Sequence, residues 1–162
     1  MCIRDRDRCL SENSAKWLVE GGAKVLEEIY VRQYYKKDLL KSDIKESKRW
    51  SIKKVSKEPK LYEKHKTSPQ KNGFDSNYAG SAFMLLALVN ELKKNNLSEE
   101  EAFELVFREF WIQRGKNDWP KAFKDTFGMS HDEFYERLSK YKRKDLKKIL
   151  PSKSLKIQDI FG

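Results

Sequence analysis

The sequence has few of the residues that bind metals or cross-link small domains. It contains two cysteines, Cys2 and Cys9, and two histidines, His65 and His131. None of them stands at metal-ligand spacing from another, so the sequence offers neither a zinc ribbon nor a disulfide framework. We expect both histidines at the protein surface, one in a lysine-rich loop and the other at a helix start.

Long apolar runs are also missing. The longest, residues 82–89, is far below the roughly 20 residues that a membrane-spanning helix needs. The N-terminal stretch MCIRDRDRCL carries charges where a signal peptide would have its apolar core. We therefore expect no membrane span, and the sequence does not indicate a compartment.

Strand signals are absent too, and no segment repeats. Apolar residues instead recur every three or four positions, which is the spacing of an amphipathic helix. A chain of 162 residues with 12% aromatics is large enough to fold around one core. We predict an all-α fold, a helical bundle of about five helices, whose core holds Phe83, Leu86, Phe107, Phe110 and Phe134.

The first two long helices differ in how much of their surface is apolar. Residues 14–37 form an amphipathic helix with Ser14 as its N-cap. Residues 76–95 are apolar nearly all round, which predicts the buried centre of the domain. Between them, residues 38–75 show only weak periodicity, and we predict a short helix followed by an extended loop that ends at Gly73.

Three later helices have explicit start and stop signals. Two of them open with a capping box, a Ser followed three residues later by a Glu. Two end at a glycine, which can adopt the left-handed conformation of a helix cap. The signals are Ser98, Glu101 and Gly115 for the first helix, Gly128 for the second, which spans residues 119–127, and Ser130 with Glu133 for the third.

The chain carries a net charge of +10, concentrated in residues 36–71 and 137–156. Such a balance is compatible with nucleic-acid binding. Solvated lysines on helix faces explain it without any partner, and we favour them because no aromatic–basic motif of a known binding module is present. The alternative stays open: a small basic helical protein that binds nucleic acid or an acidic partner through Lys36–Lys71.

The first residues do not fit a folded domain. MCIRDR is neither periodic nor apolar, and it resembles the translation of a sequencing adapter. We exclude residues 1–8 as an artefactual leader. Residues 9–150 are taken as the helical domain, and residues 151–162 as a polar tail in which IQDIF could dock on a neighbour. We expect the natural protein to begin upstream.

The stretch WLVEGGAKVLEEIY, residues 17–30, contains an unusual pair of glycines. Its apolar residues would form one helical stripe, yet Gly21 and Gly22 each cost about 1 kcal/mol relative to alanine in a helix interior. A helix that keeps two glycines there usually packs against another backbone. The pattern therefore predicts a very close helix contact next to Glu20.

Three segments, in this order, resemble the C-terminal half of a gluzincin catalytic domain, the zinc metallopeptidases typified by aminopeptidase N. WLVEGGAKVLEEIY resembles the helix whose Glu is the third zinc ligand. NYAGSAFMLLAL resembles the later helix whose Tyr steadies the oxyanion. AFKDTFGMSHDEFYERL resembles the closing turn and its acidic-aromatic helix. Together these segments span residues 17–141.

The resemblance implies that Glu20 is a zinc ligand and that Gly21 and Gly22 pack against a helix bearing His-Glu-x-x-His. It also implies that Tyr78 donates a hydrogen bond to the tetrahedral oxyanion. Taken residue by residue, plainer explanations remain. Glu20 could be exposed and paired with Lys24 at i,i+4, and the Tyr78 hydroxyl could lie in water.

The sequence departs from this family at one decisive point, because it contains no His-Glu-x-x-His. That motif supplies two zinc ligands and the general base. In the family it lies a few helical turns upstream of the Glu, where this chain has its adapter-like leader. We therefore expect the chain to be a fragment of a zinc-dependent peptidase, which hydrolyses peptide bonds with metal-activated water. The fragment itself should be inactive and free of zinc, whereas its parent should bind zinc and a peptide substrate.

Overall fold

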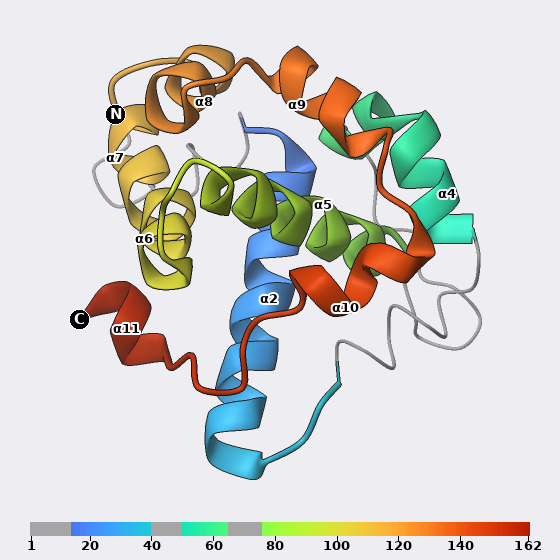
Figure 1. The fold of residues 1–162 in the computed structure, drawn as a ribbon. Helices are drawn as coiled ribbons and strands as arrows, with labels where there is room; N and C mark the ends of the chain where they lie inside the picture. Colours follow the sequence, from blue (N-terminus) through green and yellow to red (C-terminus); the bar gives the residue numbers. More distant parts are fainter. Residues whose placement is uncertain (1–13, 40–49, 65–75) are drawn as a thin grey trace.

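The structure is a computed structural model that describes residues 14–39, 50–64 and 76–162. Every regular element in these ranges is helical, which confirms the predicted all-α fold (Figure 1). The first part consists of α2 (Lys16–Tyr35), α4 (Trp50–Lys57), the 3₁₀ helix η1 (Pro59–Glu63) and α5 (Ser76–Lys93). The second part consists of α6 (Glu99–Glu104), the π-helical η2 (Leu105–Glu109), α7 (Phe110–Arg114), α8 (Trp119–Phe127), α9 (His131–Leu138), the 3₁₀ helix η3 (Arg143–Asp145), α10 (Leu146–Ile149) and α11 (Ile157–Phe161).

The number of helices exceeds the expected five. The elements α6, η2 and α7 follow one another without a break. Counting them as one and leaving aside the 3₁₀ helices η1 and η3 gives eight helices in the described residues. The eight-residue α4 is the short helix predicted within residues 38–75. The additional helices are α10, with four residues, and α11, with five. Helices of one or two turns contain too few apolar positions to give a clear period in the sequence.

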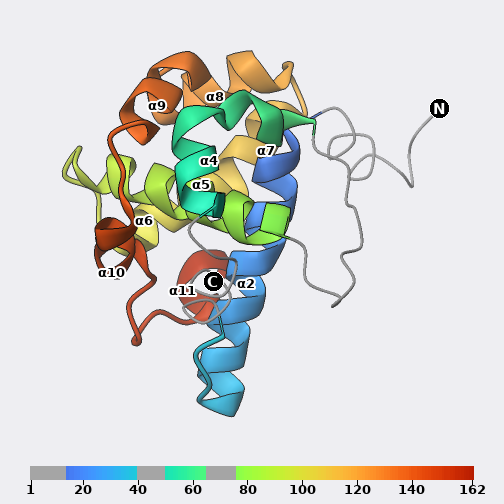
Figure 2. The same ribbon diagram turned by 90° about the vertical axis from the view of Figure 1, so that its right-hand side faces the viewer.

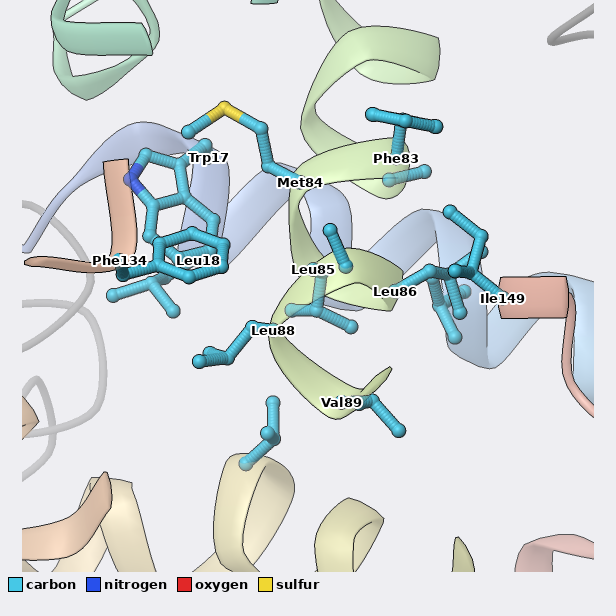
Figure 3. Close-up of a cluster of buried hydrophobic side chains, with 14 of the residues drawn as sticks. Trp17, Leu18, Phe83, Met84, Leu85, Leu86, Leu88, Val89, Phe134 and Ile149 are labelled. Atoms are coloured by element: carbon cyan, nitrogen blue, oxygen red, sulfur yellow. The ribbon is translucent and has the colours of Figure 1, made fainter. Parts of the chain in front are cut away.

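Helix α5 is the centre of the domain, as its apolar surface predicts. Residues 82–89 are all 3% exposed or less, and α2, α4, α6 and α10 all contact this helix. Burying apolar side chains on every side of one helix contributes roughly 25 cal/mol per Å² removed from water. Figure 3 shows side chains of α5 among those of other elements, including Trp17, Leu18, Phe134 and Ile149.

The predicted capping signals are confirmed at three helix ends. Ser98 and Glu101 form a complete capping box, in which Glu101 N donates to Ser98 Oγ at 3.1 Å and Ser98 N donates to Glu101 Oε2 at 2.8 Å. Ser130 and Glu133 form the same pair of bonds at α9. Gly128 ends α8 with φ at 72°, the left-handed region that glycine adopts without strain.

One further end signal is confirmed only in part, and another is wrong. Gly115 is the C-cap of α7, as predicted, but its φ is −65° and not left-handed, because the chain continues in a right-handed turn in which Lys116 N and Asn117 N both donate to Gln113 O. Ser14 is not the N-cap of α2; that position is Ala15, without a side-chain cap. The Ser14 hydroxyl instead accepts a hydrogen bond from Arg114 Nε at 3.0 Å. Ser14 therefore has a tertiary partner in place of a local one, whereas α7 ends in local backbone hydrogen bonds in place of a left-handed cap.

Four of the five expected core residues are completely buried, and Phe107 is the exception. Phe83, Leu86, Phe110 and Phe134 are inaccessible to solvent, whereas Phe107 is only partly buried. Its ring stacks on Phe103 at 5.9 Å. It belongs to the wall of a surface groove, which is described below.

Residues 151–162, which the sequence sets apart as a tail, pack on the body of the domain. Helix α11 contacts α6 and α2, as IQDIF suggested, and Leu155 and Ile160 are buried. Arg32 Nη1 donates to Pro151 O at 2.6 Å. No helix of the described residues is long and apolar enough to span a membrane. The predictions for residues 1–13, Gly73, Cys2, Cys9 and His65 lie outside the described residues.

Candidate functional site

Helices α2 and α5 cross with their backbones in contact, and the contact point is Gly21. A Cβ atom placed on Gly21 would lie 2.7 Å from the carbonyl carbon of Ser81 and 3.2 Å from the backbone nitrogen of Ala82. Only a residue without a side chain allows this approach. The close helix contact that the glycine pair predicts is therefore present, and it is made by Gly21.

The partner in that contact differs from the one that the resemblance implied. The glycines were expected to face a helix bearing His-Glu-x-x-His, but Gly21 faces the backbone of α5. At Gly22 a Cβ would lie 3.3 Å from Cε1 of Phe107, a side chain rather than a backbone. Contacts within this chain thus account for both glycines. The expectation that Gly21 packs on a helix bearing His-Glu-x-x-His is wrong, because α5 occupies that position.

The same part of α2 is joined to α9 through Trp17. The Trp17 ring stacks on Phe134 with centroids 5.5 Å apart, and its Nε1 donates to the Tyr135 hydroxyl at 3.1 Å. Tyr135 in turn donates to Glu63 Oε1 at 2.7 Å. Burial, with the hydrogen bond to the Glu63 carboxylate, raises the pKa of Tyr135 well above its usual range. This hydroxyl therefore stays protonated as the link between three elements.

The two residues assigned from the resemblance lie within about one helical turn of the crossing, each on its own helix. Glu20 immediately precedes Gly21, and Tyr78 lies one helical turn before Ser81 on α5. Both residues are partly buried. The structure thus brings together the two helices that carry Glu20 and Tyr78, although 58 positions separate these residues in the sequence.

The alternative pairing of Glu20 with Lys24 does not occur. Lys24 Nζ lies 3.5 Å from Glu27 Oε2, on the following turn of α2. Within the described part of the chain, Glu20 forms no hydrogen bond or ion pair. Tyr78 is partly buried and interacts with another group. The solvation of its hydroxyl stays a prediction.

The described residues do not by themselves fit a zinc ion. Residues 14–39, 50–64 and 76–162 contain no group of three or more His, Cys, Asp or Glu side chains that could hold a metal. Zinc sites in catalysis use three protein ligands and one open position. His131, at the start of α9, packs its ring on Trp119 with centroids 4.7 Å apart. Glu20 offers one carboxylate only.

An apolar groove of about 550 Å³ lies along α2. Its lining includes Val19, which directly precedes Glu20 in the sequence. Val19 and Ala23 line its wall on α2, and Phe107, Trp111 and Phe161 line it from η2, α7 and α11. Phe161 is 50% exposed, so the groove opens to the surface. Its chemistry suits an aliphatic or aromatic group rather than a charged one.

Besides Glu28 on α2, sequence reasoning missed a second buried carboxylate, Glu91 on α5. Its Oε1 accepts hydrogen bonds from the Tyr141 hydroxyl and Lys94 Nζ, both at 2.7 Å. Burial alone would raise the pKa of Glu91, but these hydrogen bonds and the charges of Lys94 and Arg137 lower it below the ordinary 4.5. The available signal was a glutamate in a helix that is otherwise apolar nearly all round, because such a group needs a partner.

Comparison with known proteins finds no family model, no curated protein and no solved structure that matches this chain. The geometry of the site and the chemistry of its residues therefore carry the functional argument alone.

Proposed function

We propose that this chain is the helical C-terminal half of a gluzincin-like zinc peptidase domain, in which Glu20 is a metal ligand and Tyr78 an oxyanion donor. The whole protein would hydrolyse peptide bonds with a water molecule activated by the metal. The two further ligands and the general base would come from a His-Glu-x-x-His helix upstream. This chain alone would then have no peptidase activity.

The observation that carries the proposal is the meeting of the three family-like segments. Residues 17–30, 77–88 and 122–138 are distant in the sequence, yet all three make contact around the first turns of α2. Gly21 packs on Ser81 of the second segment. Trp17 packs on the third, at Phe134 and Tyr135. Segments that form one catalytic domain would be expected to share such a centre.

Glu20 differs from the other carboxylates of α2 because it is not engaged in an ion pair with a described residue and could coordinate a metal. Glu27 pairs with Lys24 at 3.5 Å, and Glu28 is buried with its Oε1 3.2 Å from Arg32 Nε. Glu20 is partly exposed and has no partner among the described residues. A carboxylate oxygen in that state can coordinate a divalent cation without first breaking an ion pair.

The deciding experiment recovers the natural sequence upstream of residue 9 and expresses the longer protein. We expect a His-Glu-x-x-His motif there, zinc near one ion per chain by elemental analysis, and hydrolysis of a peptide library. Glu20→Gln should lose most of the zinc and the activity, because a neutral amide is a poorer ligand than a carboxylate. Glu27→Gln, on the same helix, is the matched control and should retain both. A natural upstream sequence without the motif, or full zinc content in Glu20→Gln, would show the proposal to be wrong.

A further inference from the structure

After α9 the chain runs to α10, which contacts α5 (Figure 2). A second cleft, of about 490 Å³, is lined by residues of this part of the chain and of the C-terminal end of α5. Its volume is typical of a site for a small organic ligand, on the order of 300–1,000 Å³. It shares no residue with the Glu20–Tyr78 site. Its lining residues are mostly polar: Asn90, Glu91, Lys94, Arg137, Lys140, Tyr141, Asp145, Lys148 and Ile149.

The charges around this cleft do not balance. Four cationic side chains, Lys94, Arg137, Lys140 and Lys148, line it together with two carboxylates, Glu91 and Asp145, which leaves an excess of two positive charges. Asp145 Oδ2 accepts from the backbone nitrogen of Lys142 at 2.8 Å. Lys140 and Lys148 form no ion pair with any residue that the structure describes.

A buried network holds the floor of the cleft in place. The Glu91 side chain is 5% exposed and lies 2.7 Å from Lys94 Nζ and 3.6 Å from Arg137 Nη1. Asn90 Nδ2 donates to the Tyr141 hydroxyl at 2.8 Å, and that hydroxyl donates to Glu91. The side chains of Lys94 and Arg137 are 61% and 45% exposed, so their remaining N–H groups can reach a ligand. Glu91 therefore positions two cations without using up their donors.

We propose that this cleft binds a phosphate group of a small phosphorylated molecule or of a nucleic-acid backbone. Lys140 and Lys148 supply the charge, and Arg137 supplies the directional hydrogen bonds. A phosphate monoester carries a charge of about −1.5 to −2 at neutral pH, which matches the excess of two. Arg and Lys are the side chains that bind phosphate oxygens most strongly, Arg through its planar fork and Lys as a point charge.

The test compares two double variants of the full chain that remove the same charge from the same segment. Lys140→Ala with Lys148→Ala removes the two unpaired cations of the cleft. Lys144→Ala with Lys147→Ala removes two exposed lysines that do not line it. Binding of pyrophosphate is measured by titration calorimetry at low salt, and binding of a labelled single-stranded oligonucleotide by fluorescence anisotropy.

We expect the Lys140–Lys148 variant to weaken binding of pyrophosphate by about tenfold or more and the Lys144–Lys147 variant to change it by less than about twofold. If only the oligonucleotide binds and the same variant weakens it selectively, the proposal stands with backbone phosphates as the source. Equal losses in both variants would indicate a generic effect of net charge and overturn the proposal. Absence of binding to either probe would also overturn it.

Discussion

Gly21 on α2 and Ser81 on α5 are in backbone contact, with only 2.7 Å between the Ser81 carbonyl carbon and the place where a Cβ of residue 21 would lie. This contact sets the distance between the two longest helices of the described chain. It therefore also sets the relative positions of the helix turns that carry Glu20 and Tyr78, which lie within about one turn of it on α2 and α5. The contact is a structural requirement whether or not the site binds a metal.

Gly21→Ala should destabilise the protein, whereas Gly22→Ala should not. A methyl group at residue 21 would collide with backbone atoms that cannot move independently, and such overpacking costs about 1–3 kcal/mol of the free energy of unfolding. At residue 22 it would meet Cε1 of Phe107 at 3.3 Å, an aromatic ring that is partly exposed and can shift. The gain in helix propensity, about 1 kcal/mol, should offset that contact. Urea denaturation of both variants tests this, and equal stabilities would contradict the role given to Gly21.

Tyr135→Phe should cost about 1–3 kcal/mol, because it leaves buried polar groups without a partner. The lost hydroxyl accepts from Trp17 Nε1 and donates to Glu63 Oε1. Tyr30→Phe is the matched control, since the Tyr30 side chain is 49% exposed, and it should change the free energy of unfolding by less than about 0.5 kcal/mol. Chemical denaturation measures both, and a neutral Tyr135→Phe would show that the three-residue link does not stabilise the fold.

Glu91→Gln should destabilise the protein in a manner that depends on pH. The pKa of Glu91 is lowered in the folded state, so its ionisation stabilises the fold above the unfolded pKa and this contribution is lost as pH falls through the folded value, below 4.5. At pH 7 the variant should be less stable by about 1.5–3 kcal/mol, the range for hydrogen bonds to a charged group. The difference should shrink as the pH falls below 4.5.

The matched control for this experiment is Glu104→Gln. Glu104 forms an exposed i,i+4 pair with Arg108 at 3.1 Å, and such pairs contribute about 0.3–0.5 kcal/mol. Denaturation midpoints across a pH series distinguish the two positions. A constant stability difference for Glu91→Gln at every pH would contradict the ion network described for the cleft.

Tyr78→Phe tests the second role in the proposed function. In the longer protein the variant should keep its zinc and lose about 10²-fold in kcat, the usual effect of removing one oxyanion donor. Zinc content and steady-state kinetics, measured together, separate this outcome from that of Glu20→Gln, in which the metal itself is lost. An unchanged kcat would remove Tyr78 from the site while leaving the assignment of Glu20 intact.

The sequence by itself determined the helical class, the central helix and those helix ends that depend on neighbouring residues. Ser98 with Glu101 and Ser130 with Glu133 form capping boxes because both partners lie three positions apart in one turn. Gly128 ends α8 because only glycine adopts its backbone angles freely. The paired glycines of α2 also indicated a close contact, and the local pattern was sufficient for that.

Only the tertiary structure decided which groups meet across the chain. The glycine pair could not show that its partner is the backbone of Ser81, and Ser14 bonds to Arg114, a hundred positions away, instead of capping α2. Likewise Glu91 and Tyr141, the floor of the cationic cleft, come from separate segments. Local sequence determines backbone conformation over one or two turns. The partner of a buried polar group depends on how whole helices pack.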